Sequence, residues 1–327
     1  LRAWPALLAV LAALVLLAPA PVLADHHKEP AAGAPTAKEQ VPIYRDADKL
    51  VGRVSIPDEK LAVLVQPQGR GWREFRTTIL RIVAGILIVG MVALLVFFFM
   101  KRGRIRIESG RSGRTVERFN MLERATHWLT AVSFIVLALT GLVLTFGRPL
   151  LIPLMGHPAF TGLAQASKTA HNFVGLPFVL GILLMLLLWI KDNLPERGDL
   201  VWLKSAGGLF GGGHPEAGRF NAGQKLLFWF VILAGGALAV TGFVLMTPFA
   251  YADIGGMQTA HIVHAVLAAL MITAIIGHIY IGTIGMEGAF DAMGSGQVDE
   301  NWAKEHHAGW YAKLRGRATG SRQMPAE

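Results

Sequence analysis

Two histidines, His264 and His278, lie fourteen residues apart in one apolar stretch near the C-terminus. In a helix, that spacing is about 21 Å along the axis and close to four whole turns, so both rings point to nearly the same side. The hydrocarbon core of a bilayer is about 30 Å thick. The spacing therefore suits two stacked metal centres better than one, and it indicates electron transfer across a membrane.

The composition is that of an integral membrane protein. Of the 327 residues, 53% are hydrophobic and 16% are charged, whereas soluble domains carry about 25% charged residues. We attribute the formal net charge of +9 to basic cytoplasmic loops that face lipid head groups. Nucleic-acid binding is not indicated, because no basic–aromatic nucleic-acid motif is present. The chain has no cysteine, which excludes thiolate-held iron–sulfur clusters and covalently attached haem.

Hydropathy divides the chain into six segments. We expect a secretory signal over 1–24, with an uncleaved anchor helix as the alternative, and then a polar exported segment over 25–76. His26 and His27 in that segment are interpreted as solvated, with weak metal binding as the alternative. The remaining segments are an extra transmembrane helix over 77–100, a basic linker over 101–125, a four-helix domain over 126–286 and a tail over 287–327.

Charge flanking the spans predicts their direction. Lys101, Arg102, Arg104 and Arg106 follow the first mature span, Ile82–Met100, and so mark its cytoplasmic end. The mature N-terminus is then outside and the C-terminus cytoplasmic, in a multi-pass protein of the bacterial inner membrane. The later spans are expected at Trp128–Phe146, Phe173–Ile190, Leu226–Met246 and His261–Ile284, with an outer loop over 147–170.

This topology sorts four histidines into two levels. His171 and His264 fall near the outer face, and His127 and His278 near the inner face. Ionisable residues inside spans are costly and usually functional, and two facing imidazoles are what a b-type haem requires. Zinc would require four ligands at each site. A lone buried histidine bonded to a carbonyl remains an alternative for any one of them, and His261 is an alternative outer ligand.

Five short motifs carry a resemblance to a known family. They are Glu123–Trp128 (ERATHW), Ala170–Gly175 (AHNFVG), Phe220–Lys225 (FNAGQK), Gly277–Tyr280 (GHIY) and Trp302–Tyr311 (WAKEHHAGWY). In this order they resemble the gamma subunit of membrane-bound respiratory formate dehydrogenase, a four-helix cytochrome b, over about residues 115–315. The signal, the exported segment and the extra span depart from the shorter family members.

The resemblance implies two b haems held by His127, His171, His264 and His278. It also implies a quinone site formed by Asn221, Ala222, Gly223 and Gln224 beside His278, although Asn221 could equally serve as a helix cap. The implied partners are an iron–sulfur beta subunit and a molybdenum or tungsten catalytic alpha subunit, with the formate site on the latter.

The predicted fold class is thus an all-α membrane protein, a four-helix cytochrome b bundle with one extra N-terminal helix. The predicted function is to pass electrons from the iron–sulfur subunit through both haems to quinone at the cytoplasmic side. The alternatives are a cytochrome b subunit of a hydrogenase or related oxidoreductase, and a non-redox membrane anchor.

Overall fold

The architecture comes from a computed structural model that describes residues 67–208 and 215–321. The predicted signal over 1–24, and the exported segment up to residue 66, lie outside the described residues. The chain forms two compact units. The smaller one contains described residues 67–79 and 247–259, and the larger one, Leu80–Met246 with Ala260–Glu327, contains all eight predicted site residues.

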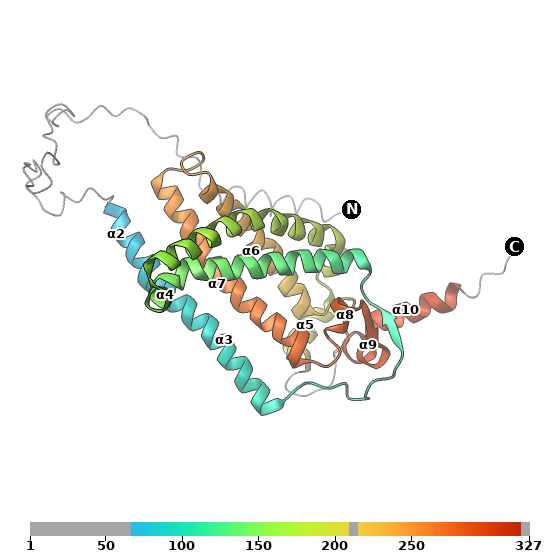
Figure 1. Ribbon diagram of the computed structural model, residues 1–327. Helices are drawn as coiled ribbons and strands as arrows, with labels where there is room; N and C mark the ends of the chain where they lie inside the picture. The colour runs from blue at the N-terminus through green and yellow to red at the C-terminus, as the bar shows by residue number, and fades with distance from the viewer. Residues whose placement is uncertain (1–66, 209–214, 322–327) are drawn as a thin grey trace, which may run out of the picture. The chain divides into compact units, whose positions relative to one another are not determined.

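The described residues are mostly helical (Figure 1). The long helices are α3 (Leu80–Arg102), α4 (Met121–Trp189), α6 (Ala222–Met246) and α7 (Ile254–Tyr280). The short helical elements are α2 (Pro67–Glu74), η1 (Phe75–Ile79), η2 (Lys191–Asn193), α5 (Arg197–Lys204), η3 (Ala206–Gly208), η4 (Ile281–Gly285), α8 (Asp291–Gly294), α9 (Glu300–His306) and α10 (Ala308–Ser321). Strands β1 (Thr115–Glu117) and β2 (Gln297–Asp299) pair antiparallel.

Four helical stretches among the described residues are long and apolar enough to cross a membrane: Gly71–Arg102, Met121–Trp189, Ala222–Met246 and Ile254–Gly285. The predicted class, an all-α multi-pass membrane protein, is confirmed. The extra N-terminal helix is α3, and its Phe98 and Phe99 each pack edge-on against Tyr280 of α7, with ring centroids 6.5 Å apart.

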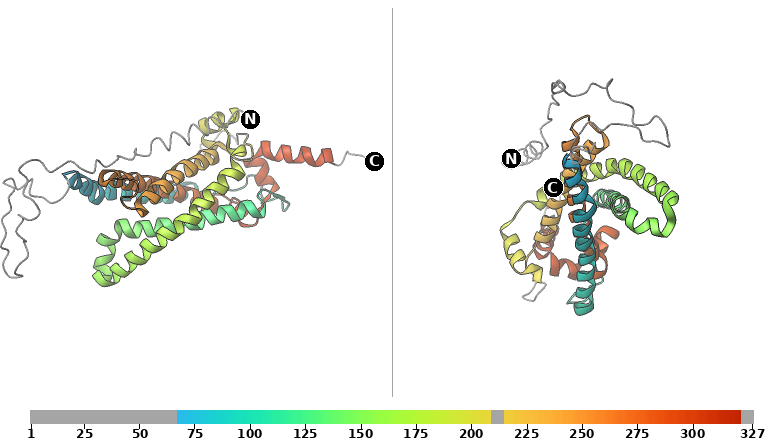
Figure 2. Two further views of the ribbon diagram at one scale, coloured as in Figure 1. Left: turned by 90° about the horizontal axis from the view of Figure 1, so that it is seen from above. Right: turned by 90° about the vertical axis from the view of Figure 1, so that its left-hand side faces the viewer.

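Helix α4 contains two of the predicted spans because it doubles back on itself (Figure 2). Residues on its two halves meet in antiparallel order: Glu123 with Trp189, Phe134 with Phe178, and Thr140 with His171. The midpoint of each pair falls at or next to Gly156. Its φ of 78° is a backbone conformation that glycine adopts at little energetic cost. The stretch 147–170, which we expected to be a loop, is therefore helical on both sides of this one residue.

An internal repeat relates α6 to the first half of α4, and the sequence reading above missed it. The segment Arg118-Phe119-Asn120 recurs as Arg219-Phe220-Asn221, 101 positions later. At the same offset, LALTGLVL (137–144) recurs as LAVTGFVL (238–245). The contacts follow the repeat: Arg118 Nη2 donates to the Arg219 carbonyl at 2.8 Å, and Arg219 Nη2 donates to the Arg118 carbonyl at 3.1 Å. The domain is thus built from two helical hairpins, α4 and α6–α7, whose first helices are related.

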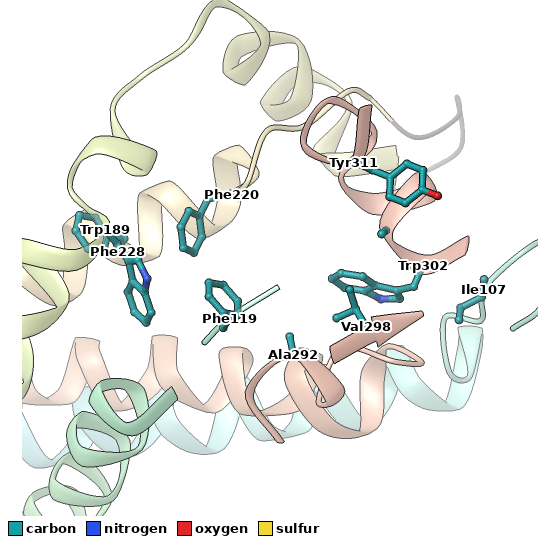
Figure 3. Packing of buried hydrophobic residues seen from close by; sticks show 10 residues of the cluster. Ile107, Phe119, Trp189, Phe220, Phe228, Ala292, Val298, Trp302 and Tyr311 are labelled. Atoms are coloured by element: carbon teal, nitrogen blue, oxygen red, sulfur yellow. The ribbon is translucent and has the colours of Figure 1, made fainter. Parts of the chain in front are cut away.

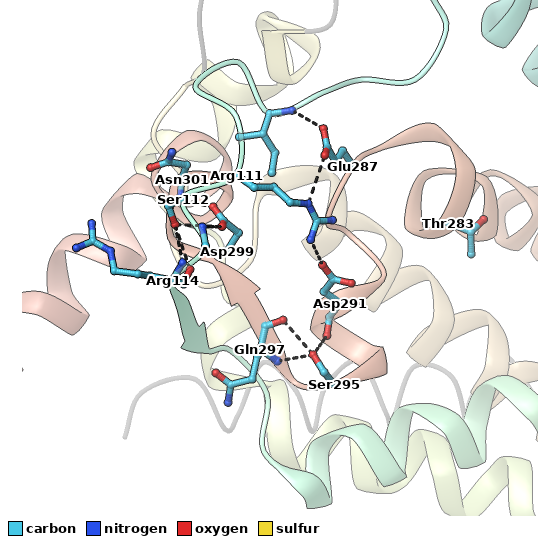
Figure 4. A network of polar contacts seen from close by, with 12 residues as sticks. Arg111, Ser112, Arg114, Thr283, Glu287, Asp291, Ser295, Gln297, Asp299 and Asn301 are labelled. Carbon is cyan, nitrogen blue, oxygen red and sulfur yellow. Dashed lines mark hydrogen bonds and ion pairs between the residues drawn. The ribbon is translucent and has the colours of Figure 1, made fainter.

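The basic linker and the tail, expected as separate segments, fold together into one small domain, which we call the cap (residues 103–120 and 286–315). β1 pairs with β2, and Ile105 bridges to Met286. Arg111 forms ion pairs with Glu287 and Asp291, and Asp299 accepts from the Gly113 amide at 3.1 Å (Figure 4).

The interior of the cap is continuous with the ends of the helices. A buried cluster joins the linker, the tail and the helix ends (Figure 3); it consists of Ile107, Phe119, Trp189, Phe220, Phe228, Ala292, Val298, Trp302, Ala303 and Tyr311. Burying each large apolar side chain here contributes about 1.5–3 kcal/mol. The tail is therefore part of the folded domain and holds the N-terminal ends of α4 and α6 together.

Two buried polar side chains lie at the centre of this cap. Arg118 is 3% exposed and lies over the rings of Phe119, Trp302 and Trp310, each 5.2 Å away. Burial and the neighbouring charge of Arg219 lower the pKa of Arg118 to about 9. His307 lies between the Gly218 carbonyl, 2.9 Å from Nδ1, and Arg118 Nη2, 3.0 Å from Nε2. Nδ1 therefore donates and Nε2 accepts, so the ring is neutral.

The stability of the cap should fall in acid because of His307. Burial, with the nearby Arg118 charge, holds the pKa of His307 well below its ordinary 6.5. Above pH 6.5 the His307 ring is neutral in the folded and in the unfolded chain. Below pH 6.5 only the unfolded chain takes up a proton on this ring, so the free energy of unfolding falls by up to about 1.4 kcal/mol per pH unit.

Thermal unfolding in detergent, followed by tryptophan fluorescence between about pH 7.5 and about pH 5, measures this effect. In His307→Asn the side chain keeps a donor and an acceptor but does not titrate, so the pH dependence should flatten. His157→Asn, at an exposed position of α4, should keep the parent slope. An unchanged slope in His307→Asn would show that another group is responsible.

Candidate functional site

The pair predicted to lie at the outer level, His171 and His264, joins the two hairpins, and we call it the outer pair. His171 lies on the second half of α4 and His264 on α7, and their ring centroids are 6.1 Å apart with an interplanar angle of 61°. Both rings are partly buried. The second helix of each hairpin thus contributes one histidine to this level.

The inner pair, His127 and His278, also joins the two hairpins, but in a different way. His127 lies on the first half of α4 and His278 near the end of α7, with centroids 6.2 Å apart at 58°. His127 is partly buried and His278 is exposed. The pairing expected from topology is therefore what the structure brings together, and α7 separates the two levels by about 21 Å.

The geometry of both pairs is compatible with one metal ion between the two rings. Imidazole nitrogens bind transition metals at about 2 Å, and this would separate the two ring centres by about 6 Å. No group of three or more metal-ligating side chains occurs in the described ranges. Two imidazoles at each level would suit haem iron, since the porphyrin would supply the other ligands.

Glycines let each outer ring lie directly against a neighbouring helix. A Cβ atom at Gly141 would be 3.5 Å from His171 Cε1, and one at Gly242 would be 3.4 Å from His264 Cε1. At these distances a Cβ atom would be at the short end of ordinary van der Waals contact, so each imidazole lies directly against the glycine backbone. Gly175, also near a histidine in sequence, has no such contact.

Hydroxyl groups beside these glycines bind the same rings, and the reading from sequence missed them. Thr140 Oγ1 lies 2.9 Å from His171 Nδ1, and Thr241 Oγ1 lies 3.0 Å from His264 Nδ1. The signal that could have revealed them is the repeated Thr-Gly pair in LALTGLVL and LAVTGFVL. The two outer histidines therefore have equivalent surroundings.

The segment Asn221–Gln224 begins α6 as a reciprocal cap. The Gln224 amide donates to Asn221 Oδ1 at 2.9 Å, and the Asn221 amide donates to Gln224 Oε1 at 3.0 Å. Gly223 packs under the ring of Trp202, because a Cβ there would be 2.8 Å from it. Capping by Asn221, given above as the alternative, is thus present, and the side-chain NH₂ groups of both residues are left as donors.

The same cap occurs at the repeat-related position of α4. Asn120 Oδ1 accepts from the Glu123 amide and Glu123 Oε2 accepts from the Asn120 amide, both at 3.0 Å. Glu123 also accepts from Trp189 and Arg219. Nearby, Lys225 is buried against Asp199 and Glu196 at 3.0 and 3.3 Å. The N-terminal ends of both hairpins are therefore fixed by charge-assisted contacts.

Comparison with known proteins identifies the family. Residues 118–296 match the model of the prokaryotic cytochrome b561 family. The chain is 33% identical over 205 residues to the formate dehydrogenase cytochrome b556(fdo) subunit of Escherichia coli K12, covering 62% of this chain and 94% of the relative.

Two further relatives have similar names. The nitrate-inducible cytochrome b556(Fdn) subunit of the same organism is 28% identical over 207 residues, 62% of this chain and 92% of the relative. The cytochrome b556 subunit of Haemophilus influenzae is 30% identical over 212 residues, 63% and 86% respectively. The chain therefore belongs to the prokaryotic cytochrome b561 family and to the cytochrome b subunits of formate dehydrogenase.

Proposed function

We propose that this chain carries electrons from an iron–sulfur subunit of a formate dehydrogenase complex to quinone in the membrane. The observation that carries the proposal is the presence of two histidine pairs with nearly equal separations, 6.1 and 6.2 Å, in a member of this family. Because the chain has no cysteine, clusters that feed electrons to it must lie on another subunit. The formate site, on a molybdenum or tungsten subunit, is likewise outside this chain.

In this proposal His171 and His264 hold an outer b haem, and His127 and His278 hold an inner one. The bound haems supply one-electron redox chemistry. The chain's own contribution is to fix the four imidazoles, to exclude water with apolar helices, and to set the distance between the two levels through α7. The separation of fourteen residues then spans most of the hydrocarbon core.

Quinone reduction is assigned to the inner level, at Asn221, Ala222, Gly223 and Gln224. The carbonyl-type oxygens of Asn221 and Gln224 are used by the cap, so their NH₂ groups are the available donors to a quinone oxygen. The position of this site beside His278 rests on the family resemblance. Protons would enter from the cytoplasmic side, where the cap lies.

The orientation follows from charge. Lys101 and Arg102 end α3, and Arg104 and Arg106 follow at once. An excess of cations beside a span marks the cytoplasmic side, so we propose a cytoplasmic C-terminus and an outer N-terminus in the bacterial inner membrane. Electron entry outside and proton uptake inside would store charge across the membrane.

The purified chain should contain two haems, and His264→Ala should contain one. Loss of one of its two imidazoles would prevent the outer level from holding haem and would break transfer from the iron–sulfur partner, while the inner pair would keep both histidines. Haem-to-protein ratio and the visible spectrum of the reduced protein measure this. His261→Ala, the matched control three residues away, should keep both haems.

Three outcomes would reject parts of this assignment. A folded, haem-free chain would favour a membrane anchor, and loss of haem in His261→Ala in place of His264→Ala would make His261 the outer ligand. Co-purification with a nickel–iron enzyme, and not with a molybdenum or tungsten one, would reject formate dehydrogenase as the donor.

Asn221→Ser should slow quinone reduction without loss of haem. Serine keeps the capping oxygen but lacks the NH₂ donor, so α6 stays capped and about one hydrogen bond to quinone is lost, lowering the rate roughly five- to tenfold. Formate-driven reduction of a short-chain quinone by the intact complex measures the rate. Asn120→Ser changes the equivalent cap of α4 and should leave the rate unchanged; equal loss in both variants would assign the effect to helix capping.

A further inference from the structure

Each outer histidine is bonded to a threonine of its own hairpin, at the same repeat position. Thr140 and Thr241 are 101 positions apart, like Arg118 and Arg219. Their Oγ1 atoms lie at nearly equal distances, 2.9 and 3.0 Å, from the histidine Nδ1 atoms. The two hairpins keep the same threonine–histidine contact although their turns differ in length. This indicates that the contact is a functional feature of the site.

The direction of these hydrogen bonds follows from the threonine hydroxyls. A hydroxyl has one hydrogen to donate. Thr140 Oγ1 donates it within α4, at 2.7 Å from the Val136 carbonyl, and Thr241 Oγ1 donates at 2.7 Å to the Ala237 carbonyl. Each oxygen can then only accept from its histidine, so Nδ1 carries the hydrogen in both rings and Nε2 carries the lone pair.

This tautomer leaves the lone pair of Nε2 free for a metal ion in both outer imidazoles.

The inner pair is built differently. His127 Nδ1 is buried, and none of the residues in the described ranges accepts a hydrogen bond from it. The repeat position of His127 in the second hairpin is Phe228, so the arrangement has no counterpart there. The two levels therefore offer imidazoles of unequal donor strength.

We infer that Thr140 and Thr241 are positioning residues that make the outer pair the more electron-rich of the two pairs. An imidazole that donates from Nδ1 is a more basic ligand and favours oxidised iron. The outer centre then has the lower midpoint potential, and electrons run downhill from outside to inside. This inference rests on the proposed function, because it requires that both pairs bind haem.

Potentiometric titration of the haem bands in the purified protein tests the inference without any enzyme activity. The inner-only variant His264→Ala first assigns each midpoint potential to a level, and the component that it removes should be the lower one. Thr140→Val and Thr241→Val should each raise that lower potential, and the double variant should raise it further. The inner potential should not move.

Matched variants separate hydrogen bonding from packing. Thr140→Ser and Thr241→Ser keep the hydroxyl and should retain the parent potentials. Thr273→Val removes a hydroxyl that donates to the Ala269 carbonyl of its own helix at 2.8 Å, and it should change neither potential. If the valine variants lose the outer haem, its retention in the serine variants would still support positioning by the hydroxyl.

Three results would overturn the inference: unchanged potentials in the double valine variant, equal effects of serine and valine, or removal of the higher-potential component by His264→Ala. None of these would affect the proposed function, which fails separately if the parent protein binds no haem.

Discussion

A polar side chain among membrane-spanning helices must find its partner inside the protein, because lipid offers none. In this chain the outer imidazoles meet that constraint through the hydroxyls of Thr140 and Thr241, which are themselves bonded to the backbone one turn earlier. Gly141 and Gly242 leave the room for each ring to approach. The placement of the helices relative to one another therefore depends on a short Thr-Gly unit that occurs once in each hairpin.

The cap likewise provides partners within the protein for its buried polar side chains. Arg118 and Arg219 each donate a hydrogen bond to the other's backbone carbonyl, and Arg219 also forms ion pairs with Glu123 and Asp192. The aromatic rings around Arg118 stabilise its charge through cation–π contacts, in the place that a carboxylate partner would otherwise take. The starts of α4 and α6 are thereby tied together, which places His127 opposite the end of α7.

Much of this arrangement was predictable from one-dimensional signals. Apolar run length and the flanking cations predict the spans, and the fourteen residues between His264 and His278 predict two levels, because both follow from helix rise alone. The helical stretch around Gly156 was not predictable in the same way. Three prolines make residues 147–170 resemble a loop, whereas helices packed in membranes tolerate them. Thr140 and Arg118 were missed because their partners, His171 and His307, lie far away in sequence, and only the 101-residue repeat hints at their importance.

The repeat also explains why the two hairpins share one polypeptide. Two identical copies of the first hairpin could assemble an outer level, because each would contribute its own threonine and histidine. They could not assemble the inner level, where His127 of one hairpin faces His278 of the other and Phe228 occupies the position that symmetry would give to a histidine. Fusion into a single chain allows each half to carry a different substitution. A homodimer has no means of breaking its symmetry in this way, and the fused chain thereby has two histidine pairs with different surroundings.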